Sequence, residues 1–188
     1  MPSAEFVISI ESRPDPAGLE INGQPVAFDS HGVDAVEILL SPNPGEPPRR
    51  LARAASGGEL SRVMLALKTV LARADDIPSL IFDEIDSGIG GATAGSVGLR
   101  LGSLGRTHQV FCVTHLPQIA AFADRHYAVH KDTDGARTAT VVRQVSGQDR
   151  LDELARMLGV VSGSSVALRH AEELFARSQE KLSCAVPG

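Results

Sequence analysis

Two adjacent carboxylates, Asp83 and Glu84, stand where a short apolar run at residues 79–82 ends. A buried strand that ends in such a pair is typical of a nucleotide-hydrolysing site, in which the Asp helps to hold Mg²⁺, directly or through water. The Glu beside it can polarise an attacking water as a general base. The same pair could also begin a helix, whose dipole would stabilise both charges. Taken alone, the pair leaves both interpretations open.

A second motif, Ser56-Gly57-Gly58-Glu59, precedes a stretch at residues 59–73 whose apolar side chains follow helical spacing. Two glycines let a ligand approach the backbone closely, and the N-terminus of a helix offers unpaired N–H groups and a partial positive charge. Together with the hydroxyl of Ser56, these features suit a phosphate. Ser56 and Glu59 also fit a capping box, which is the simpler interpretation of this motif in isolation.

The third motif is His115, which follows Thr114 at the end of another apolar run, residues 109–113. A histidine at the end of a strand can donate a hydrogen bond to a phosphate oxygen or orient a water. A single histidine in this position is more often a polar residue with an ordinary structural partner. The order of the three motifs along the chain therefore carries more weight than any one of them.

The elements that must position these residues alternate between strand and helix, which predicts an α/β fold with a mostly parallel sheet flanked by helices. We expect residues 1–50 to form a β-rich segment, with a hairpin turn at Asn22-Gly23, and residues 51–188 to form a lobe that carries the motifs. Within the lobe, the patterns predict helices at 59–73, 92–104, 149–158 and 164–182, a short helix beginning near Pro117, strands at 79–82 and 109–113, and a hairpin of 126–130 with 138–145.

The composition excludes several classes of protein. The net charge of −5 and the supply of six Phe, one Tyr and no Trp argue against a protein that coats nucleic acid or stacks its bases. Cys112 and Cys184 form no C-x-x-C pair, so we expect neither a disulfide framework nor a zinc site, and a reducing compartment fits best. No apolar run approaches the length of a membrane span, and the N-terminus does not resemble a secretion signal. We therefore expect a cytoplasmic protein without a membrane partner.

Taken together, the ordered motifs closely resemble the signature motif, the Walker B motif and the switch histidine of ABC-type ATPases, and DSGIG at residues 86–90 resembles their D-loop. The segments NPGEPPRRLARAASGGELSRVMLALK, SLIFDEIDSGIGGATAGSVG and QVFCVTHLPQIAAFAD look like the RecN family, bacterial double-strand-break repair ATPases related to the structural-maintenance-of-chromosomes (SMC) proteins. Glu59, where transporters commonly have Gln, points to RecN rather than to a transporter subunit. Ala55 replaces the Leu that begins the general signature, a change that RecN-like sequences tolerate.

The resemblance implies a fold and a role for each motif. The chain would be the C-terminal lobe of an ABC-type P-loop ATPase head, completed by an N-terminal half with the Walker A loop, since no G-x-x-x-x-G-K-[ST] occurs in these 188 residues. In dimers of such heads, Asp83 and Glu84 would face the nucleotide of their own molecule and His115 its γ-phosphate. The motif at residues 56–59 would reach the γ-phosphate on the opposite molecule, and Asp86 would couple the two sites.

The resemblance further implies ATP and Mg²⁺ as cofactors, an ATP-dependent homodimer, and DNA as a partner of the complete protein in double-strand-break repair and recombination. The isolated chain would hydrolyse ATP negligibly. Two alternatives remain: the head lobe of another ABC-type ATPase, of chromosome-maintenance or transporter type, and a non-catalytic DNA-interaction module. In the last case Arg49, Arg50 and Arg53 would contact DNA phosphates, although a solvated edge is the simpler interpretation of these arginines.

Overall fold

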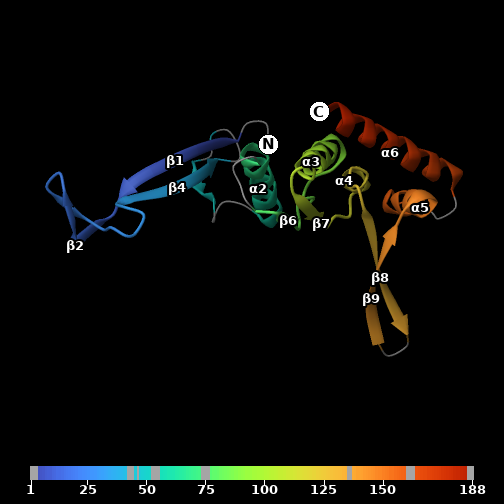
Figure 1. The fold of residues 1–188 in the computed structure, drawn as a ribbon, viewed down its shortest axis with the longest axis horizontal. Coiled ribbons are helices and arrows are strands. Elements are labelled where there is room, and N and C mark those ends of the chain that lie inside the picture. The colour runs from blue at the N-terminus through green and yellow to red at the C-terminus, as the bar shows by residue number, and fades with distance from the viewer. Residues whose placement is uncertain are drawn as a thin grey trace. The chain divides into compact units, whose positions relative to one another are not determined.

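In the computed structural model the chain divides by its internal contacts into two units, Met1–Ser56 and Gly57–Gly188 (Figure 1). The structure describes residues 4–41, 45, 47–51, 56–72, 77–134, 137–159 and 164–185. The described part of the first unit is mostly strand, and the second unit alternates strands with helices. This confirms the predicted α/β class.

The first unit is built on an antiparallel sheet. Strand β1 (Glu5–Ser12) pairs with β4 (Asp34–Ser41), which also pairs with the short β5 (Arg49–Arg50). Strands β2 (Pro14–Ile21) and β3 (Gln24–Val26) form the predicted hairpin. Its two-residue turn has Asn22 at φ 51° and Gly23 at φ 79°, the left-handed conformation that an Asn-Gly hairpin turn requires.

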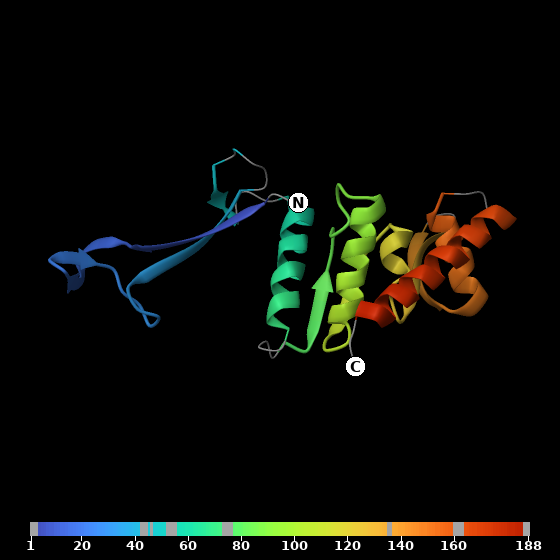
Figure 2. The same ribbon diagram turned by 90° about the horizontal axis from the view of Figure 1, so that it is seen from above.

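The second unit begins with helix α2 (Gly57–Leu71), strand β6 (Ser79–Phe82), helix α3 (Gly91–Leu104) and strand β7 (Gln109–Cys112). The two strands pair in parallel, with Ile81 beside Phe111. The helices α2 and α3 pack with the strands around one apolar core, which includes Leu65, Phe82 and Ile85 (Figure 2). The mostly parallel character that we predicted applies to this pair, because the other described strand pairs are antiparallel.

Helix α3 forms although three glycines lie inside it. At Gly98 a Cβ atom would come within 2.5 Å of the Phe122 ring, so the glycine lets the helix approach the segment that follows α4. The packing contact therefore offsets the low helix propensity of glycine at this position.

The rest of the second unit consists of α4 (Pro117–Ala120), the antiparallel hairpin β8 (His126–Asp134) with β9 (Arg137–Val145), α5 (Gly147–Met157) and α6 (Ser165–Ala185). A second apolar cluster, which includes Leu154 and Ala171, joins α5 to α6. Arg150 is buried beside it, with its guanidinium 4.5 Å from the centre of the Phe175 ring. Of the helices that the structure describes, none combines the length and the apolar composition needed to cross a bilayer.

Candidate functional site

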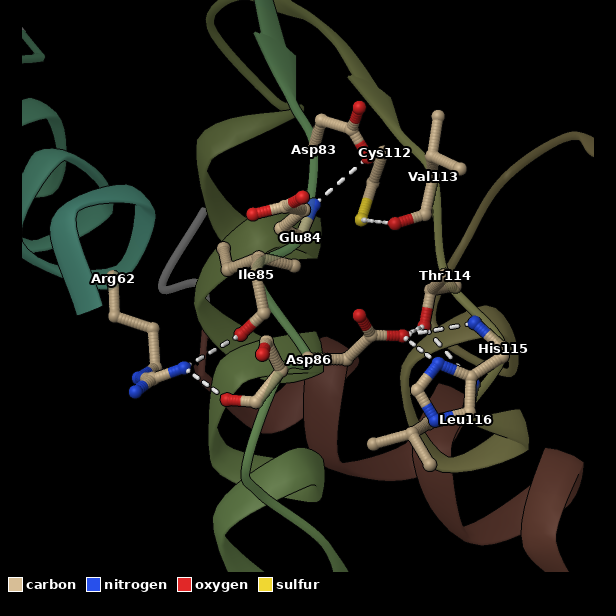
Figure 3. A network of polar contacts seen from close by, with 11 residues as sticks. Arg62, Asp83, Glu84, Ile85, Asp86, Cys112, Val113, Thr114, His115 and Leu116 are labelled. Atoms are coloured by element: carbon tan, nitrogen blue, oxygen red, sulfur yellow. Dashed lines mark hydrogen bonds and ion pairs between the residues drawn. The ribbon is translucent and has the colours of Figure 1, made fainter. Parts of the chain in front are cut away.

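The site is built where the parallel strands β6 and β7 end. Since the carboxyl ends of parallel strands meet at one edge of a sheet, Asp83 and Glu84 after β6 lie at the same edge as His115 after β7. A hydrogen bond of 3.0 Å from Val113 N–H to Phe82 O continues the pairing up to this edge. The structure thus brings together two of the three motifs singled out in the sequence (Figure 3).

The carboxylate pair sits in a tight, strained turn. Glu84 has φ 55°, a conformation that is uncommon outside glycine and that often marks a functional position. Its N–H donates to Asp83 Oδ1 at 2.8 Å, and its carbonyl accepts from Ser87 N–H at 2.9 Å. The Ser61 hydroxyl of α2 donates to the Asp83 carbonyl at 2.8 Å. Both acidic residues remain exposed.

The motif at residues 56–59 also reaches this edge, through the first residues of α2. A Cβ atom on Gly57 would overlap the Glu84 carboxylate. One on Gly58 would lie 2.7 Å from the Glu84 carbonyl oxygen and 2.7 Å from Ser87 Cβ. The two glycines therefore allow the N-terminus of α2 to lie directly against the turn that carries Glu84. Ser56 is exposed immediately before the helix, and Glu59 lies in its first turn.

Because Gly58 lies so close to the turn that carries Glu84, a methyl group at this position should lower the stability of the fold. We expect Gly58→Ala to destabilise the protein by about 1–3 kcal/mol, because the added atom forces the turn at Glu84 to shift. The matched control is Gly95→Ala in α3, where a Cβ would meet nothing within 4 Å. That change should stabilise the protein by about 0.5–1 kcal/mol, since alanine favours a helix interior. Thermal unfolding of both variants measures this, and equal melting temperatures would contradict the close approach.

On the other side of the turn, the Asp86 carboxylate holds the end of β7. Its Oδ2 atom accepts hydrogen bonds from the Thr114 hydroxyl at 2.6 Å and from the His115 N–H at 2.8 Å, and lies 2.9 Å from His115 Nδ1 (Figure 3). The Thr114 oxygen in turn accepts from the Leu116 N–H at 3.0 Å. The Asp86 side chain is 7% exposed and that of His115 is 75% exposed.

The pKa of Asp86 reflects this network. Burial by itself raises the pKa of the carboxyl, but the hydrogen bonds from Thr114 and from the His115 backbone, together with the charge of His115, bring it below its usual value. Asp86 is therefore ionised at neutral pH. Burial, with the nearby charges of Asp86 and Asp83, raises the pKa of the Cys112 thiol to about 12, so this cysteine supplies no reactive thiolate to the site.

Arg62 of α2 fastens the same turn from the opposite side. Its Nη1 donates to the carbonyl oxygens of Ile85 at 3.2 Å and of Ser87 at 2.8 Å (Figure 3). Sequence reasoning missed Arg62 and Ser61 because both fall within the predicted helix, where a polar residue is normally solvated. It also gave Thr114 no role beyond its position before His115.

The residues with a predicted DNA role lie in the first unit or outside the described part of the chain. Arg49 and Arg50 form β5 and are exposed, and Arg50 Nε lies 2.7 Å from Glu37 Oε2. Arg53 is not among the described residues. One of the three predicted arginines therefore already carries an ion-pair partner, and contact with DNA stays a prediction.

The donor set at the turn suits a magnesium ion only in part. Within the described ranges, no group of three or more His, Cys, Asp or Glu side chains is arranged to hold a metal. Asp83 and Glu84 offer exposed carboxylate oxygens, which are ligands that Mg²⁺ prefers, and Mg²⁺ in nucleotide sites usually takes only one or two carboxylates besides phosphate and water. The residues therefore fit an ion that a nucleotide shares.

Comparison with known proteins gives these motifs a context. No protein-family model matches the chain. It is 50% identical over 175 residues to the DNA repair protein RecN of Streptomyces coelicolor, covering 93% of the chain and 31% of that protein. It is 48% identical over 175 residues to the DNA repair protein RecN of Treponema pallidum, covering 93% of the chain and 30% of that protein.

Among solved structures, the Smc head domain with a coiled coil and joint from Pyrococcus yayanosii matches with a TM-score of 0.55 and 24% identity, covering 82% of this chain and 26% of that one. This likeness shows the fold, that of an Smc head domain. The chain spans about a third of the length of the curated relatives that it matches. Across nearly all of its own length, the chain therefore belongs to the RecN family.

Proposed function

We propose that the chain is the C-terminal half of the ATP-binding and ATP-hydrolysing head of a RecN-like DNA repair protein. The observation that carries the proposal is the meeting of Asp83, Glu84 and the α2 N-terminus at the edge where β6 and β7 end, beside His115. This arrangement puts acidic side chains, a histidine and a helix N-terminus at one edge, and such groups can position a water and stabilise the charge of a transferring phosphoryl group. Two relatives that are 48% and 50% identical to the chain are DNA repair proteins, which supports a role in DNA repair.

In the proposed site, Glu84 is the general base that takes a proton from the attacking water. Asp83 holds Mg²⁺, directly or through water, and the ion supplies charge neutralisation for the phosphate oxygens. His115 donates to the γ-phosphate, for which its 75% exposure leaves the ring accessible. The strained turn places the exposed Glu84 side chain beside the N-terminus of α2, where its carboxylate lies against Gly57.

The signature motif at residues 56–59 supplies the complementary half of a second site. We propose that Ser56, Gly57 and Gly58 bind the γ-phosphate of an ATP held mainly by another copy of the head. Gly57 is exposed at the N-terminus of α2, where the first N–H groups of a helix and its dipole favour an anion. ATP would then join two heads, and hydrolysis at Glu84 would release them.

The first partner in this proposal is the N-terminal half of the same head, which would provide the Walker A loop. The sheet of β6 and β7 has one face buried against α2 and α3 and the other apolar and exposed, with Ile81 76%, Phe111 49% and Val113 64% exposed. Parallel strands are normally covered on both faces. An apolar recess of about 240 Å³ beside Leu60, Met64 and Ile81 extends this face. A further protein segment is the occupant that such a surface fits.

Membership of the RecN family supports a DNA partner and a cytoplasmic location for the complete protein. DNA would bind the complete protein, with Arg49, Arg50 and Arg53 as candidate phosphate contacts, and the protein would act in the bacterial cytoplasm. Loss of salt-dependent DNA binding when these three arginines are changed to alanine would favour their role.

The proposed function is tested by the mass of the full-length protein in solution. We expect sedimentation to show a head-to-head dimer with a non-hydrolysable ATP analogue and Mg²⁺, and a smaller species with ADP, because only the γ-phosphate contacts both signature and Walker motifs. We also expect steady ATP turnover. Full-length protein that neither binds nor hydrolyses ATP, or whose mass ignores the nucleotide, would contradict the proposal.

A further inference from the structure

We propose that Asp86 is a positioning residue of its own active site, which fixes the ring of His115 and turns its Nε2 atom toward the nucleotide. This inference rests on the proposed ATPase function and goes beyond it. The resemblance assigns Asp86 to contacts between the two copies, whereas the geometry within one copy points to His115.

One carboxylate oxygen holds both the backbone and the ring of the same residue. Asp86 Oδ2 lies 2.8 Å from the His115 backbone nitrogen and 2.9 Å from its Nδ1. Two contacts to one atom define the orientation of the ring relative to its own backbone, which an isolated exposed histidine lacks. The third contact, from the Thr114 hydroxyl at 2.6 Å, fixes the residue before it. The end of β7 is therefore held in place from the turn that follows β6.

The chemistry of the pair also selects the hydrogen on the ring. A carboxylate only accepts hydrogen bonds, and Nδ1 lies 2.9 Å from Asp86 Oδ2, so the ring form with its hydrogen on Nδ1 is favoured over the form that places a lone pair there. The other nitrogen, Nε2, is then the atom left to act on a ligand. The partner that imposes this is buried, with 7% of the Asp86 side chain exposed, while the ring it orients is 75% exposed. A buried carboxylate that orients an accessible histidine is a recurring means of preparing a reactive imidazole.

Two further contacts prevent Asp86 from moving away. The turn that carries it is tied to α2 by Arg62, which binds the carbonyl oxygens of the residues on either side, Ile85 and Ser87. Ile85 itself is fully buried in the apolar core. The position of His115 therefore depends, through Asp86, on the apolar core and on α2.

The test is a double-mutant cycle on the full-length protein with Asp86→Asn and His115→Ala. Asparagine keeps the size of the side chain but removes the charge. We expect Asp86→Asn to lower kcat by about 10- to 100-fold, as loss of an orienting partner commonly does, with KM changed much less. In the His115→Ala background, Asp86→Asn should change kcat little further, because its effect passes through the missing ring.

Two controls separate this role from a loss of folding. Glu172→Gln on α6 removes the same charge from an exposed position and should leave kcat unchanged. Thr114→Ser keeps the hydroxyl that binds Asp86, so it should retain more turnover than Thr114→Val. An Asp86→Asn protein with wild-type kcat would overturn the proposal, as would equal and independent losses from Asp86→Asn and His115→Ala.

A second readout does not depend on turnover. In full-length protein labelled with ¹⁵N at histidine, the ring of His115, assigned by its loss in His115→Ala, should be the Nδ1–H form at pH 8. In Asp86→Ala it should shift toward the Nε2–H form that predominates in free histidine. If the His115 ring keeps the same form in Asp86→Ala as in the wild-type protein, the inference is overturned. If the ring responds as expected but Glu84→Gln hydrolyses ATP normally, the proposed catalytic function fails while the link between Asp86 and His115 stands.

Discussion

In the full-length protein, changing Glu84 to glutamine is expected to reduce ATP hydrolysis by about 100- to 10,000-fold, the range that a general base contributes. Glutamine has nearly the same size as glutamate but cannot take a proton from water. The Glu84 carboxylate lies where a Cβ of Gly57 would be, and glutamine fills nearly the same space there. Binding of ATP should therefore survive, and ATP-bound dimers should accumulate.

Steady-state turnover and sedimentation with ATP measure the two halves of this prediction. Glu172→Gln is the matched control, since it makes the same chemical change on the exposed surface of α6. Normal hydrolysis by the Glu84 variant would exclude Glu84 as the base. Lost hydrolysis together with lost ATP binding would mean that Glu84 supports the fold of the site rather than the proton transfer.

The 188-residue chain on its own is expected to hydrolyse ATP no faster than a blank, at concentrations where the full-length protein turns over readily. The described site offers carboxylates, a histidine and a helix N-terminus, but this sequence contains no G-x-x-x-x-G-K-[ST] loop to surround the β- and γ-phosphates. Positioning of the phosphates provides much of the catalysis in phosphoryl transfer, so its loss should remove nearly all turnover.

This prediction is checked by malachite-green or coupled assays on the purified chain, with circular dichroism to show that its helices are formed. Adding the N-terminal part of the same protein as a separate polypeptide should restore hydrolysis. Robust turnover by the chain alone would contradict the proposal that the head is divided between two segments.

Much of the fold follows from local sequence patterns. The predicted strand at 79–82 is β6 in full, and the helix predicted at 92–104 differs from α3 by one residue. Pro117 begins α4 as predicted, and Gly159, at φ 76°, follows the end of α5. These features depend on periodicity, on proline and glycine and on short turns, all of which act within a few residues.

The polar network of the site could not be predicted in the same way. Ser61 meets Asp83 across 22 residues, and Asp86 meets His115 across 29 residues, so no local pattern relates them. Arg150 is a similar case: an arginine in an amphipathic helix is normally solvated, yet this one is buried and donates to the Ala123 carbonyl at 2.6 Å. Each pairing depends on which elements the fold places side by side.

The attachment of α2 to the turn at residues 83–87 has a consequence for the timing of hydrolysis. Ser61 and Arg62 bind three carbonyl oxygens of this turn, so a displacement of the helix N-terminus also displaces the backbone that carries Glu84. In a pair of heads with the proposed geometry, that N-terminus would bind one nucleotide while Glu84 serves the other. Hydrolysis of one nucleotide would then change how the other nucleotide is bound. The two hydrolysis reactions would be kinetically coupled through α2 and its attached turn in each copy.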